Sequence, residues 1–191
     1  MLKTLCLLVA LMIAESTVLA QSVLELHDAA VGGDKAALGQ LSALASKGDA
    51  TAQFKLGYMY RYGEGVSKDA AQAVVWYRKA AEQGLTFAQS TLGDAYANGE
   101  GVPKDAAQAA VWYRKAAERG YANAQSNLGA EYSIGVGVPK DLVLAYMWRN
   151  LAAAQGDDIG KTARDALEKS MTPAQIAEAQ KMSREWKPKK N

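Results

Sequence analysis

The stretch Leu85–Gly120 reads LTFAQSTLGDAYANGEGVPKDAAQAAVWYRKAAERG, and it is the second of three tandem copies of one 36-residue unit. The other two copies are Asp49–Gly84 and Tyr121–Gly156. The first and second copies agree at 24 of 36 positions. Self-similarity at such a period is typical of stacked repeat proteins, because one unit alone cannot bury its apolar face. The sequence therefore predicts a helical repeat scaffold that works by binding.

Each copy is expected to contain two helices joined by a glycine-rich turn. In the second copy Ala88, Leu92 and Tyr96 recur every four residues, which places them on one stripe of an α-helix over about residues 86–98. Gly99 is expected to end this helix in the left-handed cap conformation. Asp105 is the expected N-cap of the second helix. The predicted fold is all-α, a superhelical solenoid of antiparallel helix pairs.

A glycine recurs inside the first helix of every copy, at Gly57, Gly93 and Gly129. Glycine in a helix interior costs ~1 kcal/mol relative to alanine. A cost that recurs three times predicts a close approach by the backbone of a neighbouring helix. In the second helix the recurring large residue is tryptophan, which is expected to be buried between helices at Trp76, Trp112 and Trp148.

The chain outside the three copies has a less regular pattern. Lys3, the apolar run Leu5–Ala14 and the small residues Val18–Ala20 together predict a cleaved signal peptide. Asp34 is a predicted N-cap in the leading segment, and Thr172 opens a predicted capping box near the end. The predicted domain plan is a signal peptide over 1–20, a degenerate capping repeat over 21–48, full repeats over 49–84, 85–120 and 121–156, a second capping repeat over 157–187, and a basic tail over 188–191.

The charge distribution argues against nucleic acid as a partner. The formal net charge is +2, but the last eleven residues alone carry +4, so residues 21–180 carry about −2. The one cysteine, Cys6, lies in the leader, which leaves the mature chain without a disulfide or a thiolate metal site. After leader removal no membrane span is expected, and the protein is expected to be a monomer.

The pattern shared by the three copies resembles the Sel-one-like repeat family, a relative of the tetratricopeptide repeats with a slightly longer period. The residues that carry the resemblance are Leu56, Gly57, Tyr60, Gly63, Gly65, Trp76, Ala80 and Gly84 in the first copy, Leu92, Gly93, Tyr96, Gly99, Gly101 and Trp112 in the second, and Leu128, Gly129, Tyr132 and Trp148 in the third. The third copy departs from the pattern at Arg149 and Asn150, which replace a Tyr-Arg pair, and at Val136.

The resemblance implies an α/α superhelix that makes protein–protein contacts, often in bacterial envelope, secretion or signalling complexes. Some secreted relatives carry a cysteine pair in each repeat and are linked to penicillin binding. This chain lacks those cysteines. A secreted hydrolase or a cell-wall-binding protein of that kind is the alternative reading, and a purely structural spacer is a third.

Residues with catalytic potential are sparse. The connector Gly63–Lys68 lacks the spacing of a phosphate loop and does not follow a strand. The one histidine, His27, lies beside Glu25 and Asp28, and we expect it to face solvent on a capping helix. A metal site needs more convergent ligands than these. The sequence thus predicts a protein that is not an enzyme and that uses no cofactor and no metal.

The copies differ mainly in their first helices. Nine of the twelve differences between the first and second copies fall within residues 49–62 or their equivalents. A uniform second helix is typical of a structural element, whereas a diversified first helix is typical of a recognition surface on the concave face of a solenoid. The predicted partner-binding residues are Phe54, Lys55, Tyr58, Arg61 and Tyr62 in the first copy, Ser90, Asp94 and Asn98 in the second, and Ser126, Asn127, Ala130 and Ile134 in the third.

The role of the aromatic residues stays open at this stage. Phe54, Tyr58 and Tyr62 lie on one face of the predicted helix, roughly opposite its packing stripe. Aromatic residues and arginine are enriched at interface hot spots, which favours a binding role. The rings could equally pack under the leading segment, residues 22–48.

Overall fold

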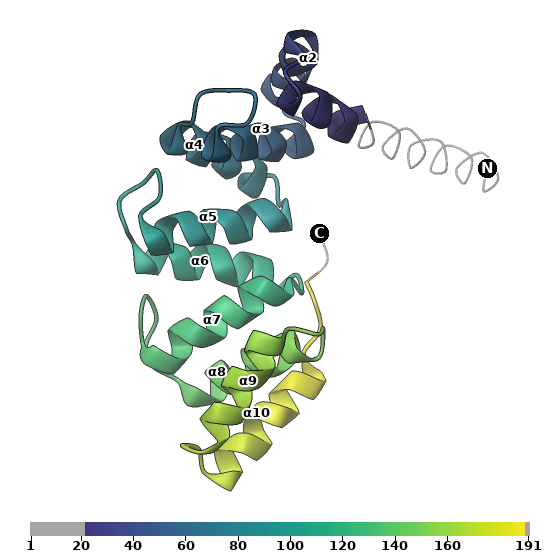
Figure 1. Ribbon diagram of the computed structural model, residues 1–191. Coiled ribbons are helices and arrows are strands. Elements are labelled where there is room, and N and C mark those ends of the chain that lie inside the picture. Colours follow the sequence, from purple (N-terminus) through teal and green to yellow (C-terminus); the bar gives the residue numbers. More distant parts are fainter. Residues whose placement is uncertain (1–21, 190–191) are drawn as a thin grey trace, which may run out of the picture. The chain divides into compact units, whose positions relative to one another are not determined.

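A computed structural model describes residues 22–189 of the chain. Over that range the structure is helical and contains no strand (Figure 1). The helices are α2 Lys35–Ser46, α3 Ala50–Tyr62, α4 Ala70–Glu82, α5 Thr86–Asn98, α6 Ala106–Ala117, α7 Ala122–Ile134, α8 Leu142–Ala153, α9 Asp158–Glu168 and α10 Pro173–Glu185. Residues 22–31 are helical as well. The all-α repeat fold is therefore confirmed, while the predicted signal peptide lies outside the described residues.

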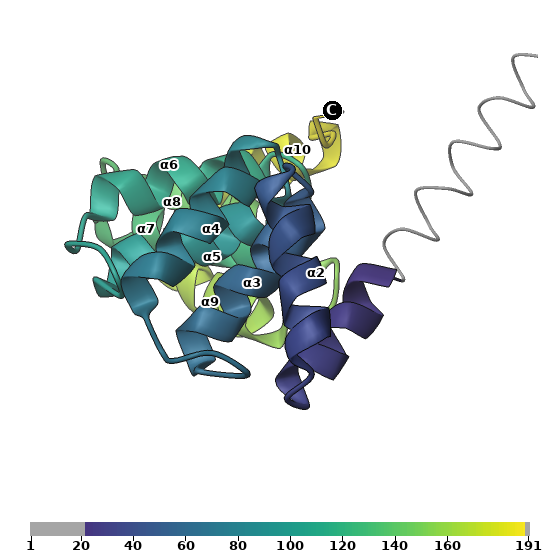
Figure 2. The same ribbon diagram turned by 90° about the horizontal axis from the view of Figure 1, so that it is seen from above.

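The described residues divide into two compact units, one that ends at Ala80 and one that begins at Ala81. In the first unit the helical residues 22–31, drawn in dark purple in Figure 2, lie beside α2, and both contribute to one apolar cluster with α3. Val23, Leu41, Leu56 and Met59 are almost completely buried in that cluster. In the second unit each of α5 to α8 packs on the next, and both α9 and α10 pack on α8. No helix within residues 22–189 is both long enough and apolar enough to cross a membrane.

The expected helix boundaries are confirmed at the level of individual caps. The side chain of Asp105 accepts a hydrogen bond from the backbone N–H of Gln108 at 3.0 Å, and Asp34 caps α2 in the same manner. Gly99 ends α5 at φ 74°, a left-handed conformation in which its N–H donates to the carbonyl of Ala95. Thr172 forms the predicted capping box at the start of α10. Each cap satisfies backbone groups that a helix end leaves without an intrahelical partner.

The recurring glycines make room mainly for a side chain of the second helix, and the expected close approach of a neighbouring backbone is found at two of the three. A Cβ atom on Gly93 would lie 2.6 Å from two ring carbons of Tyr113, and one on Gly57 would lie 2.8 Å from the ring of Tyr77. In the third repeat the same place is taken by the side chain of Arg149, 2.9 Å from a Cβ on Gly129. A backbone carbonyl also lies 3.1 Å from a Cβ at two of these positions, that of Ala73 at Gly57 and that of Ala145 at Gly129. The glycine thus makes room for a side chain of the second helix in its own repeat.

A buried glutamine ties each repeat to the helix before it. The side-chain amides of Gln53, Gln89 and Gln125 donate to the carbonyls of Ala45, Ala81 and Ala117 at 3.0, 3.1 and 3.1 Å. All three glutamines are at most 4% exposed. An amide buried in this way needs a partner, because leaving it unpaired would cost ~1–3 kcal/mol. The glutamine of the repeat motif therefore holds each repeat to the one before it.

Two expectations about buried side chains need correction. His27 is 8% exposed and does not face solvent, because its ring packs edge-on against Tyr58 at 6.0 Å and Nδ1 lies 3.0 Å from a carboxylate oxygen of Asp28. Trp112 and Trp148 are buried as expected, at 5% and 7% exposure. Trp76 is only partly buried, at the margin of the first unit's cluster.

Candidate functional site

A polar pocket of about 480 Å³ lies in the second unit, between the first helices of the second and third repeats. We call it the α5–α7 pocket. Its lining consists of Ser90, Thr91 and Asp94 from α5, Tyr121, Asn123, Ser126 and Asn127 at or within α7, Arg149 from α8, and Asp157 and Ile159 at the start of α9. Four of the predicted partner-binding residues thus meet around one cavity: Ser90, Asp94, Ser126 and Asn127.

The repeat sequence explains why polar side chains gather there. The positions that stay the same in every repeat, such as Leu92 and Leu128, are fully buried and hold the helices together. The lining residues of α5 and α7 occupy positions that differ between repeats. Ser90 and Ser126 lie deepest, at 4% and 5% exposure. These two serines therefore belong to the pocket floor and offer little open surface.

Asp94 is held in place by its neighbours. One of its carboxylate oxygens accepts a hydrogen bond from the hydroxyl of Tyr113 at 2.7 Å and another from the side-chain amide of Asn127 at 3.2 Å. Burial raises the pKa of the Tyr113 hydroxyl, and the carboxylate of Asp94 raises it further. The tyrosine thus remains a hydrogen-bond donor, and the position of Asp94 is fixed by donors from α6 and α7.

Arg149 contributes the positive charge of the pocket. Its side chain is 9% exposed, and Nη1 donates to the hydroxyl of Ser126 at 2.9 Å. Burial lowers the pKa of this guanidinium, and the carboxylate of Asp157 partly offsets that effect. Asp157 accepts hydrogen bonds from the backbone N–H groups of Ile159 and Gly160 as the N-cap of α9. An arginine stays protonated in proteins, so a buried cation faces this cavity.

An apolar rim lies at the edge of the α5–α7 pocket. The rings of Phe87 and Tyr121 meet edge to face at 5.0 Å, and Phe87 is 54% exposed. Ile159, on the α9 side, is 72% exposed. Exposed apolar side chains beside fixed polar groups are the usual composition of a ligand pocket.

The predicted aromatic face of the first repeat is partly used for packing. The ring of Phe54 lies 5.5 Å from that of Tyr77, and Tyr58 lies between His27 and Tyr62, with a ring separation of 4.4 Å to Tyr62. Tyr62 is the most open of the three predicted rings, at 51% exposure. The guanidinium of Arg61 lies 5.4 Å from the Tyr62 ring, and Lys55 is half-buried.

The remaining predicted binding residues belong to the second unit and lie outside the pocket lining. Asn98 and Ile134 are exposed at the ends of α5 and α7, and Ala130 is half-buried. None of these three lines the α5–α7 pocket. Their binding role stays a prediction.

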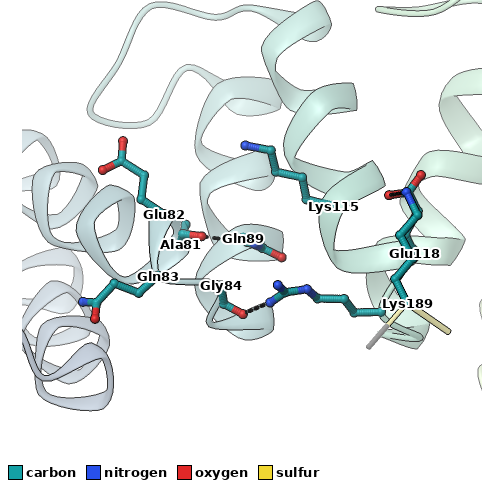
Figure 3. Close-up of a pocket in the computed structure, with 9 residues that line it drawn as sticks. Ala81, Glu82, Gln83, Gly84, Gln89, Lys115, Glu118 and Lys189 are labelled. Atoms are coloured by element: carbon teal, nitrogen blue, oxygen red, sulfur yellow. Dashed lines mark hydrogen bonds and ion pairs between the residues drawn. The ribbon is translucent and has the colours of Figure 1, made fainter. Parts of the chain in front are cut away.

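A second cavity of the same unit, about 370 Å³, is largely satisfied by its own lining (Figure 3). Gln89 donates to the carbonyl of Ala81, and Arg119 donates to the carbonyl of Gly84. Lys189 forms an ion pair with Glu118 at 2.7 Å. Because these groups already pair with one another, this cavity offers a ligand fewer free contacts than the α5–α7 pocket.

Sequence reasoning did not assign Arg149, Tyr121, Asn123 or Asp157 to the site. The signal for Arg149 was present, since it replaces the tyrosine found at Tyr77 and Tyr113. Over residues 22–189, His, Cys, Asp and Glu side chains do not gather in any group of three that could hold a metal ion.

Comparison with known proteins agrees with the helical repeats described above. The Sel1 repeat matches residues 50–85, 86–121 and 122–157 of this chain. The chain belongs to the Sel1 repeat family. Proteins of this family are generally non-catalytic repeat scaffolds that mediate protein interactions.

Two solved structures illustrate the relationship. One is c5321, a protective antigen present in uropathogenic Escherichia coli strains and displaying an SLR fold, with 40% identity and a TM-score of 0.73. That match covers 80% of this chain and 33% of the antigen, so this chain spans about a third of its length. The other is a Sel1 repeat protein from Oxalobacter formigenes, with 43% identity, a TM-score of 0.63, and coverage of 68% of this chain and 97% of that one. Among curated proteins none matches.

Proposed function

We propose that this Sel1 repeat protein is an exported, non-catalytic scaffold of the bacterial envelope or of a secretion or signalling complex. It binds a protein or peptide partner in a groove formed by the first helices of its second and third repeats. The observation that supports this proposal is the lining of the α5–α7 pocket. The helix positions that differ between repeats surround that pocket, whereas the shared positions form the core. Extended faces built from variable positions are how repeat solenoids bind their partners.

A photo-crosslinking experiment tests the groove. A photoreactive phenylalanine analogue is introduced at Asn123, which is exposed and lines the α5–α7 pocket, and separately at Gln108, which is exposed on α6. Both replace an exposed amide residue, so the two variants are matched. We expect a discrete crosslinked product from position 123 in native envelope fractions and none from position 108. The same product from both positions, or from position 108 alone, would contradict the groove.

Export has its own test. The apolar run Leu5–Ala14 and the small residues before Gln21 support cleavage after Ala20. Intact-mass analysis of the protein from its native host is expected to give a chain that begins at Gln21. A mass that still includes Met1 would contradict export through this leader. Purified protein is also expected to show no turnover of penicillin-type or cell-wall substrates, which separates a scaffold from the hydrolase alternative.

A further inference from the structure

Arg149 is a buried cation at a position that holds a tyrosine in the two preceding repeats. Tyr77 and Tyr113 fill the space over Gly57 and Gly93, and Arg149 fills the same space over Gly129. A guanidinium has five N–H donors. Within the described part of the chain, Arg149 makes one hydrogen bond, from Nη1 to the hydroxyl of Ser126, and its Nε is buried without a partner. A change from ring to guanidinium therefore leaves a desolvated cation whose donors are poorly satisfied.

The acidic groups of the α5–α7 pocket do not supply hydrogen-bond acceptors to Arg149. Asp94 accepts from Tyr113 and Asn127, and Asp157 accepts from two backbone N–H groups of α9. Within residues 22–189 neither carboxylate lies within 4.0 Å of Arg149 as an ion pair. A buried charge that lacks close acceptors is costly, and a ligand that supplies them recovers that cost on binding.

We propose that the α5–α7 pocket binds a carboxylate group of the partner, with the guanidinium of Arg149 as its principal donor. This inference rests on the proposed function and names the chemistry that the groove recognises. Arginine matches the planar geometry of a carboxylate, and charge-assisted hydrogen bonds of this kind are roughly twice as strong as neutral ones. Asp94 and Asp157 beside Arg149 give the pocket lining a formal charge of −1, so a dianion such as phosphate is disfavoured more strongly than a monoanion such as a carboxylate.

The rim indicates what accompanies the carboxylate. Tyr121 and Ile159 both line the pocket, and Ile159 is 72% exposed. An apolar side chain next to the bound carboxylate would cover them. A partner peptide supplies this combination at its C-terminus, when the last residue is apolar, or internally, when an aspartate or glutamate is followed by an apolar residue.

Nuclear magnetic resonance of ¹⁵N-labelled protein tests the proposal with three probes. The first is N-acetylphenylalanine, which carries a terminal carboxylate beside an aromatic ring. The second is the amide-capped dipeptide acetyl-Glu-Phe-amide, in which the carboxylate is on a side chain. The third is N-acetylphenylalaninamide, which has the ring and no carboxylate. Each is titrated while the Nε–H signal of Arg149 and the side-chain amide signal of Asn127 are followed.

We expect at least one carboxylate probe to shift both signals saturably, and the amide probe to bind at least fivefold more weakly. The stronger of the two carboxylate probes then identifies the source as a chain terminus or a side chain. Equal binding of the amide probe, or no shift with either carboxylate probe, would overturn the proposal.

Two variants complete the test. Arg149→Tyr restores the residue of the earlier repeats over Gly129, so we expect it to fold and to lose carboxylate binding as judged by the Asn127 signal. Arg164→Lys lies outside the pocket lining, and we expect it to bind the probes as the parent protein does. Undiminished binding by Arg149→Tyr would refute the role of Arg149. The crosslink from position 123 reports on the groove independently, so it survives if the carboxylate inference alone fails.

Discussion

The glycine inside α5 offers a decisive test of how the two helices of a repeat pack. We consider Gly93→Ala, which adds one methyl group. In an open helix this change stabilises the protein by ~1 kcal/mol, because alanine is the better helix former. Gly39 supplies that reference in this chain, since it lies exposed within α2 and a Cβ there would meet nothing within 4 Å. We therefore expect Gly39→Ala to raise the free energy of unfolding by up to about 1 kcal/mol.

At Gly93 the packing should make the same change destabilising. The new Cβ would lie 2.6 Å from ring carbons of Tyr113, well inside the ~3.5–4.0 Å at which carbon atoms rest in contact. The ring would have to move by roughly 1 Å, yet it is 4% exposed and its hydroxyl is bonded to Asp94 at 2.7 Å. Overpacking costs ~1–3 kcal/mol and a strained hydrogen bond ~1 kcal/mol more. After subtraction of the helix-propensity gain, Gly93→Ala should destabilise the protein by ~1–3 kcal/mol.

Urea denaturation followed by circular dichroism measures these differences in the free energy of unfolding. The comparison requires that the variants share the same dependence of that free energy on urea concentration. The full test is a double-mutant cycle with Tyr113→Ala. In that background the clash is gone, so Gly93→Ala should become stabilising by ~1 kcal/mol, which gives a coupling of ~2–4 kcal/mol. If Gly93→Ala stabilises the parent protein as Gly39→Ala does, or if the cycle shows no coupling, the ring does not explain the glycine.

Three further predictions follow from burial and charge. Trp112→Ala should lower the free energy of unfolding by ~3–5 kcal/mol, because the indole is 5% exposed. The same change at the partly buried Trp76 should lower it clearly less. Chemical denaturation compares the two variants, and equal losses would contradict the difference in burial. Burial raises the pKa of Glu131 from 4.5 to about 7, and Arg114 only partly opposes this. The folded state therefore binds more protons than the unfolded state between those values, so stability should fall by at most ~3 kcal/mol as pH rises from about 4.5 to 7, and Glu131→Gln should flatten that profile. Tyr58→Ala should lower the melting temperature, because the Tyr58 ring packs on His27. The same change at Tyr62, which is 51% exposed, should leave the melting temperature nearly unchanged. Calorimetry of both variants measures the two melting temperatures, and equal values would contradict the prediction.

The helices of this protein could be predicted from sequence because their signals are local. Asp105 and Gly99 mark a helix start and a helix end, and each acts on backbone groups within four residues of itself. The period of the repeat then placed the same signals in the other copies, and α5 spans Thr86–Asn98 as the spacing of Ala88, Leu92 and Tyr96 indicated.

The candidate site was harder to predict because its contacts join distant parts of the chain. Asp94 and Asn127 were named as binding residues, yet the hydrogen bond between them spans 33 positions and has no sequence signature. Arg149 was visible as a departure from the repeat, but its burial against Gly129 depends on how two helices pack. The same reason explains the error over His27, since a polar residue on a capping helix is buried or exposed according to what packs on it.

The buried glutamines bear on how such a chain can grow. The bonds from Gln89 to Ala81 and from Gln125 to Ala117 each cross the junction between two consecutive copies. A copied segment of one period carries a donor near its beginning and the matching acceptor near its end. Gene duplication in whole periods therefore inserts a segment that satisfies both neighbours at once, whereas a duplication of any other length leaves a buried amide without its acceptor. Arrays of this kind are thus free to lengthen by whole repeats without new mutations at the junctions.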